Sequence, residues 1–267
     1  SSPSGRPIIW KASASSKTGS RTSTSRISAS HRCSRAALAL LALAACAALA
    51  ACEPAESRQP NILLIVVDTL RADHVGCYGH VRETSPTLDR LAAESYRFER
   101  AYATAPWTMA SVASLFTGLY PGSHGVTSTS RLPNEALTLA EILQSRGYAT
   151  AGVVSHVVLG RTYDVHQGFD RYEDEVPGAA HDDISTGRVT DRSIEDLEGL
   201  SAGKRPFLLF AHYFDPHYNY LPHPEVDFAP PRVGRLDATQ TIKELRAMSG
   251  DLSAEEVAFI RDLYDEE

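Results

Sequence analysis

The fold of this chain is decided by one stretch, Arg58-Gln-Pro-Asn-Ile-Leu-Leu-Ile-Val-Val-Asp-Thr-Leu-Arg71. Ile62 to Val67 is an unbroken apolar run rich in β-branched residues, which is typical of a strand buried on both faces of a parallel sheet. Asp68 follows directly and therefore stands at the carboxyl end of that strand. Open α/β sheets build their ligand sites at this edge, so Asp68 is a candidate metal ligand or catalytic group. The alternative is that Asp68 only caps a turn or the next helix.

Strand and helix patterns alternate along the rest of the chain. Ala149 to Val154 and Phe207 to Phe214 are further apolar runs that predict buried strands. Helices are predicted from Ser85-Pro86, over Ala110 to Thr117 before Gly118, from the capping box Thr138-Leu-Ala-Glu141, and from the capping box Ser253-Ala-Glu-Glu256. Because strands joined by such crossovers pair in parallel, the pattern predicts an α/β fold.

Three finer expectations accompany this outline. Leu88, Leu91 and Ala92 should form the inward face of the first predicted helix. Tyr96 to Ala103 alternates aromatic and charged residues, which predicts a strand. The last predicted helix continues to Glu267 without a stop signal, and about three parallel strands are fewer than the five or six that such sheets usually hold. We therefore expect the chain to lack its carboxyl-terminal part.

Composition and charge limit the classes of function. With 267 residues, 43% of them hydrophobic, the chain has the composition of a globular protein with a substantial core. Residues 1–52 carry seven basic side chains and no acidic one, so all 33 Asp and Glu residues lie in the body that follows. Such an acidic body argues against nucleic acid as a partner. Of the four cysteines only Cys77 falls within that body, which therefore cannot hold a disulfide framework.

The amino-terminal segment has the layout of an export signal. Residues 1–35 are rich in Ser, Thr and basic residues and are expected to be disordered. Ala36 to Ala51 adds sixteen apolar residues, fewer than the ~20 of a membrane-spanning helix. The ending Leu49-Ala-Ala-Cys52 resembles a bacterial lipoprotein signal, in which Cys52 would carry lipid and residues 53–59 would form a tether. This predicts a lipid-anchored protein on the periplasmic or extracellular side of the bacterial cell envelope, and the alternative is an ordinary cleaved signal with an incidental cysteine.

Two hydroxyl side chains stand at the start of the helix predicted before Gly118. These are Thr108 and Ser111. Free backbone N–H groups and the helix dipole favour a sulfate or phosphate group at such an end. Thr108 is therefore a candidate nucleophile, although it could also serve only as the helix N-cap.

Polar side chains also gather at the end of the strand predicted over Phe207 to Phe214. They are His212, Asp215 and His217. Acid and imidazole groups at a strand end suit metal binding or contact with an anionic substrate. His212 lies within the apolar run and is expected to be a satisfied core residue, so His217 is the better functional candidate.

Five motifs occur in an order that matches a known enzyme family. They are Pro60 to Gly79, Ser85 to Leu91, Ala113 to Pro121, Gln167 to Asp170 and Asp215 to His217. Together they closely resemble the sulfatase family of the alkaline phosphatase superfamily, over the range from Pro60 to Glu267. The resemblance implies an α/β/α sandwich, a divalent metal such as Ca, Mg, Mn or Zn, and hydrolysis of sulfate or phosphate esters of small molecules or glycans. It also implies that Asp68 is the first metal-binding acid, Thr108 the nucleophile and His217 a contact to the anionic group.

The chain departs from the family pattern around the nucleophile. Typical sulfatases place Cys or Ser there, converted to formylglycine, with Pro two residues on and Arg four residues on. This chain has Thr108, Ala110 and Val112 instead. Thr cannot become formylglycine, so none is expected.

Other family positions also differ. Thr69 stands where sulfatases have a second metal-binding acid, and Ser155 and Val157 stand at the spacing of a family Lys and His. The later Asp-His pair that completes the family's metal site does not occur before Glu267. This agrees with a truncated chain, which by itself is expected to be inactive.

Thr is the nucleophile in related phosphodiesterases, phosphonate hydrolases and phosphoethanolamine transferases. The expected function is therefore metal-dependent ester hydrolysis, with phosphate or phosphonate esters favoured over sulfate esters. Two alternatives remain open, a non-catalytic lipoprotein that binds glycans or anionic polymers, and a transferase of phosphorylated head groups.

Overall fold

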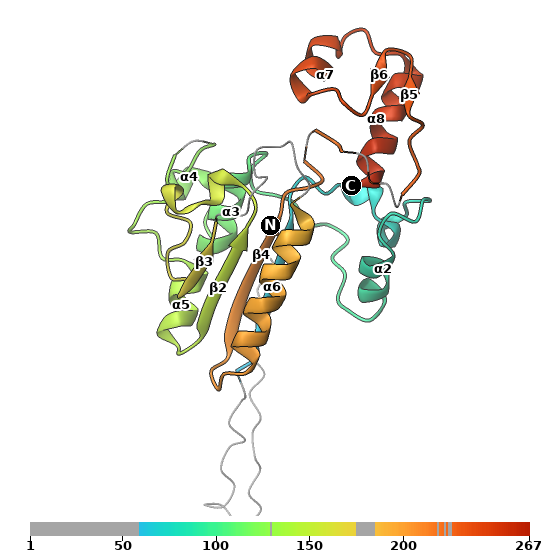
Figure 1. The fold of residues 1–267 in the computed structure, drawn as a ribbon. Helices are drawn as coiled ribbons and strands as arrows, with labels where there is room; N and C mark the ends of the chain where they lie inside the picture. Colours follow the sequence, from blue (N-terminus) through green and yellow to red (C-terminus); the bar gives the residue numbers. More distant parts are fainter. Residues whose placement is uncertain (1–58, 129, 175–184, 218, 222, 224–225) are drawn as a thin grey trace, which may run out of the picture. The chain divides into compact units, whose positions relative to one another are not determined.

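The computed structural model describes residues 59–128, 130–174, 185–217, 219–221, 223 and 226–267. Its centre is a four-stranded parallel sheet with the order β1-β4-β2-β3 (Figure 1). The strands are β1 (Ile62–Val67), β2 (Ala149–Val154), β3 (Arg171–Glu173) and β4 (Phe207–Tyr213). The predicted α/β class and its three apolar strands are confirmed.

Strand register brings polar residues together at one edge of the sheet. Val66 lies opposite His212 across the β1–β4 pair, and Val154 lies opposite the same histidine on the other side. Asp68 continues the ladder, because its N–H donates to the carbonyl of Tyr213 at 2.8 Å. The carboxyl ends of β1, β4 and β2 therefore meet, as expected for parallel neighbours.

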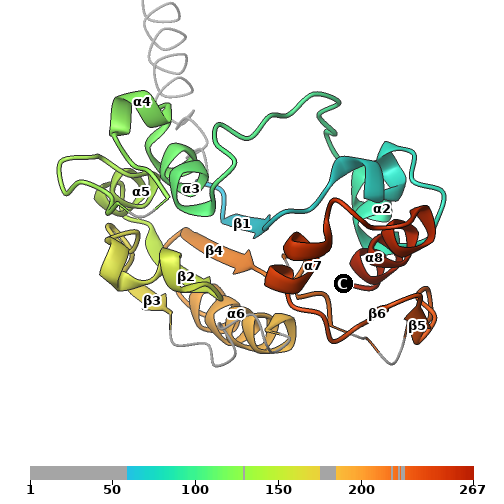
Figure 2. The same ribbon diagram turned by 90° about the horizontal axis from the view of Figure 1, so that it is seen from above.

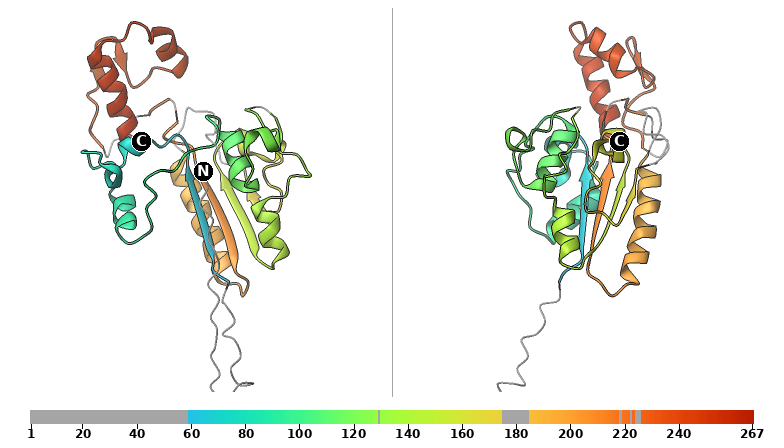
Figure 3. Two further views of the ribbon diagram at one scale, coloured as in Figure 1. Left: turned by 180° about the vertical axis from the view of Figure 1, so that it is seen from behind. Right: turned by 90° about the vertical axis from the view of Figure 1, so that its left-hand side faces the viewer.

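Helices cover both faces of the sheet (Figure 3). On one face lie α3 (Thr108–Thr117) and α5 (Leu139–Ser145), and on the other lies α6 (Thr186–Ser201). The α5 capping box is present as predicted, with the Thr138 side chain accepting from the Glu141 N–H and Glu141 accepting from the Thr138 N–H. The predicted α/β/α layering is thus confirmed.

The core follows from these layers. On the side of α3 and α5, the strand residues Val154, Leu208 and Phe210 pack with Met109, Phe116 and Leu143 of these helices. On the opposite side, Val153 packs with Val189 of α6, and Ala151 and Leu209 pack with Leu197 and Leu200 of the same helix. Along each strand, alternate residues point to opposite faces, so each helix layer receives every second side chain.

The prediction that β1 is buried on both faces is wrong for the residues described. Leu63 and Ile65 are 49% and 54% exposed. Both point to the face covered by α6. That helix packs on β4 and β2, so the side chains of β1, an edge strand of this sheet, stay exposed there.

Two other expectations are also corrected. Tyr96 to Ala103 forms no strand, and Tyr96, Phe98 and Tyr102 are exposed, because an alternating pattern makes a strand only where an unpaired sheet edge receives it. The helix α2 (Pro86–Ala93) is present, but Leu88 and Leu91 of its supposed inward face are exposed.

The remaining elements are short or lie near the carboxyl end. Short helical turns are Ala72–His74, Gly76–Tyr78, α4 (Pro121–His124), Val157–Leu159 and Arg161–Tyr163. The strands β5 (Arg232–Val233) and β6 (Leu236–Asp237) pair antiparallel and lie near α7 (Ile242–Met248) and α8 (Ala254–Glu266) (Figure 2). The predicted capping box at Ser253 is confirmed at the start of α8, whose Phe259 and Leu263 pack with Leu236.

The predicted membrane attachment depends on residues outside the described ranges. Among the helices of the described ranges, none combines the length and apolar character needed to cross a membrane. The predicted disordered leader, the signal segment and the lipidation residue Cys52 lie outside the described residues.

Candidate active site

Thr108 and Asp68 meet at the carboxyl edge of the sheet although 40 residues separate them in the sequence. The Thr108 hydroxyl donates a hydrogen bond to Asp68 Oδ2 at 2.7 Å. Thr108 is the first residue of α3, and the N-cap position before it belongs to Trp107, which makes no side-chain cap. The alternative in which Thr108 only caps its helix is therefore wrong.

The start of α3 offers N–H donors beside this hydroxyl that have no acceptor within the helix. The N–H of Ser111 is the first to bond within the helix, to the carbonyl of Trp107 at 2.9 Å. The three preceding N–H groups, from Thr108 to Ala110, have no acceptor in the helix. Together with the helix dipole they form a place for an anionic group next to Thr108.

Ser111, the second predicted hydroxyl, lies one turn further along the helix. It lines a cavity of about 220 Å³ together with Val66, Tyr102 and Leu115. The structure therefore separates the two hydroxyls, with Thr108 at the carboxylate and Ser111 in the wall of a partly apolar cavity nearby.

His212 is buried, as predicted, but its ring faces the candidate site. Its side chain is fully buried, and its Nε2 lies 3.5 Å from Asp68 Oδ2. Within the described residues neither ring nitrogen has a hydrogen-bond partner. The expectation that His212 is a core residue with satisfied ring nitrogens is therefore wrong. Its ring faces Asp68 because Val66, its partner in the register, lies on the same face of β1 as Asp68.

Asp68 is held as a carboxylate by its neighbours. Burial, the largest influence on its pKa, favours the neutral acid. Contacts with the His212 imidazole and the Thr108 hydroxyl, and electrostatic attraction from His212 and His217, outweigh burial and hold the pKa of Asp68 below its ordinary value of 3.8. At neutral pH Asp68 is therefore ionised.

Asp215 does not join this cluster. Its Oδ1 accepts hydrogen bonds from the Ser185 N–H at 3.1 Å and the Ser185 hydroxyl at 2.8 Å, and its Oδ2 accepts from the N–H and hydroxyl of Thr186. These donors lie at the start of α6, so Asp215 caps that helix. The hydrogen bonds of Asp215 are therefore those of a helix cap, and its predicted part in metal binding or substrate contact stays a prediction.

His217 lies at the edge of the site, beside a residue that the sequence interpretation missed. The rings of His217 and Phe214 stack with centroids 4.3 Å apart, and the ring of His156 stacks on Phe214 at 4.1 Å. The sequence interpretation considered Ser155 and Val157 as the family positions after β2, but the Ser155 hydroxyl donates to the His212 carbonyl and Val157 is exposed. The signal that points to His156 is its place directly beyond the carboxyl end of β2.

The donor groups at this edge suit a divalent cation. Asp68 supplies carboxylate oxygens, Thr108 a hydroxyl oxygen, and His212 a buried nitrogen that lacks another partner. Thr69 does not join them, because its hydroxyl donates to the carbonyl of Pro216 at 2.8 Å. The residues present therefore fit a metal through Asp68 and His212, and the described chain offers no second acid beside them.

Comparison with known proteins assigns the family. A family model described as Sulfatase matches residues 60–241. The chain belongs to the sulfatase family. Arylsulfatase A of Homo sapiens is 41% identical to it over 130 residues, which cover 44% of this chain and 25% of that protein. N-acetylglucosamine-6-O-sulfatase of Bacteroides thetaiotaomicron is 29% identical over 187 residues, covering 63% of this chain and 33% of that protein.

Solved structures agree on the fold of this sulfatase-family chain. The phosphonate monoester hydrolase of Agrobacterium radiobacter superimposes with a TM-score of 0.57 at 21% identity, over 78% of this chain and 56% of that structure. The sulfatase-like α/β/α fold predicted from the sequence is therefore confirmed. The chain spans only 25% and 33% of the two sequence relatives.

Proposed function

We propose that the complete protein is a metal-dependent hydrolase of sulfate or phosphate-type esters in which Thr108 is the nucleophile. The observation that carries this proposal is the 2.7 Å hydrogen bond from the Thr108 hydroxyl to Asp68 at the first turn of α3. It joins a hydroxyl, an ionised carboxylate and a helix end that attracts anions.

Each group has a distinct part in the reaction. Asp68 accepts the hydrogen bond from Thr108, which directs an oxygen lone pair of Thr108 away from the carboxylate and toward a bound ester. The free N–H groups at the start of α3 stabilise negative charge that develops on the transferred group. His217 and His156 lie at the same edge and are the candidate contacts to the ester's anionic oxygens.

A divalent metal bound through Asp68 and His212 would act as a Lewis acid for the ester oxygens and would favour the alkoxide of Thr108. A formylglycine is not part of this proposal, because a threonine side chain occupies the nucleophile position.

The substrate class follows from two sources of support. Relatives named arylsulfatase A and N-acetylglucosamine-6-O-sulfatase support esters of aromatic alcohols or sugars. The Thr108 hydroxyl favours phosphate or phosphonate centres. Its oxygen would bond to phosphorus while the bond from phosphorus to the leaving alcohol breaks, and water would then displace the phosphoryl group from the threonine. The cavity bounded by Tyr102 and Leu115 would receive the organic part of the ester.

Kinetics of two Thr108 variants of the complete protein test the proposal. Thr108→Ala should lower kcat/KM for aryl phosphate, phosphonate and sulfate esters by roughly 10³-fold or more, because the attacking oxygen is gone. Thr108→Ser should retain a measurable fraction of the activity, because it keeps the hydroxyl. Turnover by the alanine variant at the wild-type rate would rule out Thr108 as the nucleophile.

We also propose that Cys52 carries lipid and fixes the protein to the bacterial cell envelope. The support is the sequence Leu49-Ala-Ala-Cys52 after an apolar segment with a basic flank. Mass spectrometry of the mature amino terminus should find a diacylated Cys52, and Cys52→Ser should release the protein from the membrane fraction. An unmodified mature terminus at another residue would contradict this assignment.

A further inference from the structure

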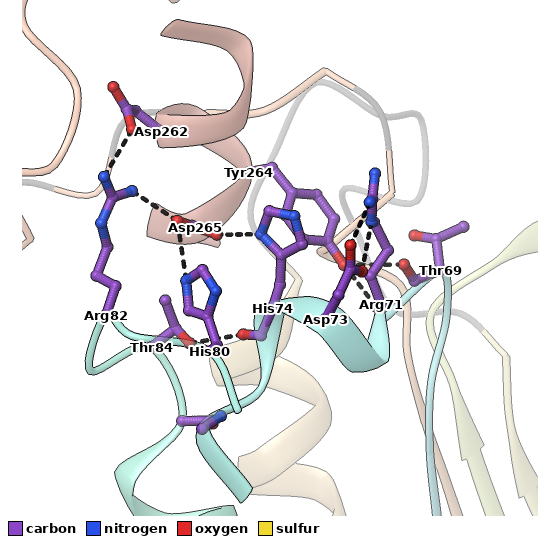
Figure 4. A network of polar contacts seen from close by, with 12 residues as sticks. Thr69, Arg71, Asp73, His74, His80, Arg82, Thr84, Asp262, Tyr264 and Asp265 are labelled. Carbon is purple, nitrogen blue, oxygen red and sulfur yellow. Dashed lines mark hydrogen bonds and ion pairs between the residues drawn. The ribbon is translucent and has the colours of Figure 1, made fainter. Parts of the chain in front are cut away.

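Outside the candidate active site, three metal-ligating side chains converge where helix α8 meets the loop that follows β1 (Figure 4). His74 Nδ1 lies 2.5 Å from Asp265 Oδ1, and His80 Nε2 lies 3.3 Å from Asp265 Oδ2. One donor atom from each residue lies within 4.8 Å of the others. Two imidazoles and one carboxylate are a recurrent ligand set for zinc.

The cluster is buried and holds a nitrogen without a hydrogen bond. The side chains of His74, His80 and Asp265 are 10%, 15% and 4% exposed. Within the described residues, His80 Nε2 has no hydrogen-bond partner, although it is directed at the carboxylate. A buried polar atom in this state is costly unless another group satisfies it, and a metal ion would do so.

Neighbouring groups hold the three side chains in place. Arg82 donates to Asp265 Oδ2 at 2.6 Å and to Asp262 at 2.8 Å, so it does not occupy Asp265 Oδ1, the oxygen that contacts His74. The Thr84 hydroxyl donates to the His74 carbonyl at 2.6 Å and fixes that part of the loop. Supporting contacts of this kind orient the ligands of protein metal sites.

We propose that His74, His80 and Asp265 bind a Zn²⁺ ion, separate from the metal at Asp68. Ligand atoms about 2.0–2.1 Å from a tetrahedral zinc lie roughly 3.3 Å apart. The distance from His74 Nδ1 to Asp265 Oδ1 needs to open by less than about 1 Å to reach this value, and the three donor atoms already lie within 4.8 Å of one another. The fourth position is left to water.

The zinc fastens α8 to the turn beside the candidate active site. The Tyr264 hydroxyl, one residue before Asp265, donates to the Thr69 carbonyl at 3.0 Å and accepts from the Arg71 N–H at 2.7 Å. Thr69 directly follows Asp68 and has a positive φ of 55°. Ordering Asp265 therefore also orders the turn that leaves Asp68.

Metal titration of the complete protein carrying Asp68→Asn tests this site by itself. The substitution removes the carboxylate of the other site and weakens metal binding there, and the cluster variants described below show whether the remaining metal is bound by His74, His80 and Asp265. After removal of metal with a chelator, calorimetry should find one Zn²⁺ per chain, Zn²⁺ should raise the Tm, and Co²⁺ should give the visible absorption of a four- or five-coordinate ion. Absence of Zn²⁺ binding by this folded variant would overturn the proposal.

Further substitutions in the same background assign the ligands. His80→Gln or Asp265→Asn should weaken Zn²⁺ binding by at least about 100-fold and abolish the Zn²⁺-dependent rise in Tm. His223→Gln is the matched control, because it removes another histidine contact to a carboxylate, Glu267 at the end of α8, and should leave Zn²⁺ binding unchanged. Unchanged Zn²⁺ affinity in a folded His80→Gln variant would also overturn the assignment. None of these readouts depends on ester hydrolysis, so the zinc site and the proposed hydrolase activity stand or fall separately.

Discussion

A single hydrogen bond joins the two residues on which the proposed chemistry depends. Asp68 Oδ2 accepts from the Thr108 hydroxyl and also lies 3.5 Å from His212 Nε2. Burial alone would raise the pKa of Asp68, but these contacts lower it, so the carboxylate stays ionised beside the nucleophile. The same residues thus account for both charge and orientation at the site.

A second polar pair, Ser114 and His124, has a structural role. His124 Nε2 lies 2.9 Å from the Ser114 hydroxyl, which donates to the Ala110 carbonyl, and His124 Nδ1 accepts from the Val126 N–H. This arrangement assigns the proton of a neutral imidazole to Nε2 and satisfies every group. A protonated ring would lose the bond from Val126.

We predict that the stability of the protein falls on acidification because of His124. Burial lowers the pKa of His124 below its ordinary value of 6.5, so the unfolded chain takes up a proton that the folded chain resists. The stabilisation is fully present above pH 6.5 and is lost as the pH falls toward the folded pKa. Urea unfolding at several pH values should show this slope.

The variant His124→Gln should flatten that slope. At pH 8 it should be less stable than wild type by about 1–3 kcal/mol, because buried hydrogen bonds are lost. As the pH falls below 6.5 the difference should shrink. An equally steep loss of stability in the variant would show that another group is responsible.

Some site residues could be predicted from the sequence and others could not. Asp68 and Thr108 follow from local patterns, a strand end and a helix start. The contact of His212 with Asp68 depends on the strand register, because only its position opposite Val66 directs its ring toward Asp68. An apolar run reveals that a histidine is buried but not which group it faces.

At the scale of elements, helix α6 depends on a side chain far away in the sequence. Asp215 accepts four hydrogen bonds from Ser185 and Thr186 at its start. No acid within the first turn of α6 takes this place. The loop after β4 therefore supplies the cap for the helix that covers β4.

We predict that Asp215→Ala destabilises the protein by about 1–2 kcal/mol in urea unfolding, because the donors at the start of α6 lose their acceptor. Asp191→Ala, an exposed position in the middle of the same helix, is the matched control and should change the free energy of unfolding by less than about 0.5 kcal/mol. Equal effects of the two substitutions would contradict the capping role.

Elements with a strong local signal were predictable, and elements defined by tertiary contacts were not. The capping boxes at Thr138 and Ser253 mark the starts of α5 and α8 correctly. The strand β3 has only three residues, of which Tyr172 alone is buried, so no apolar run announces it. Conversely, Tyr96 to Ala103 has the alternation of a strand but finds no partner within the described residues.

At the scale of the whole molecule, the chain covers part of a larger family architecture. It holds the sheet edge with Asp68, Thr108 and His217, and it spans 25% of arylsulfatase A. Its family and layering could be read from ordered motifs and from strand and helix alternation. The contacts between α8 and the loop after β1 could not, because they join residues 180 or more positions apart and depend on side chains of α8.

The most direct measurement of the central claim is the location of the covalent intermediate. The complete protein is mixed with an aryl phosphate ester, quenched in acid within one turnover, digested and examined by mass spectrometry. The account predicts a phosphoryl group on Thr108 that is absent from the Thr108→Ala variant. A phosphoryl group on Ser111 or on a histidine, or turnover by the alanine variant without any covalent intermediate, would contradict the claim that Thr108 is the nucleophile.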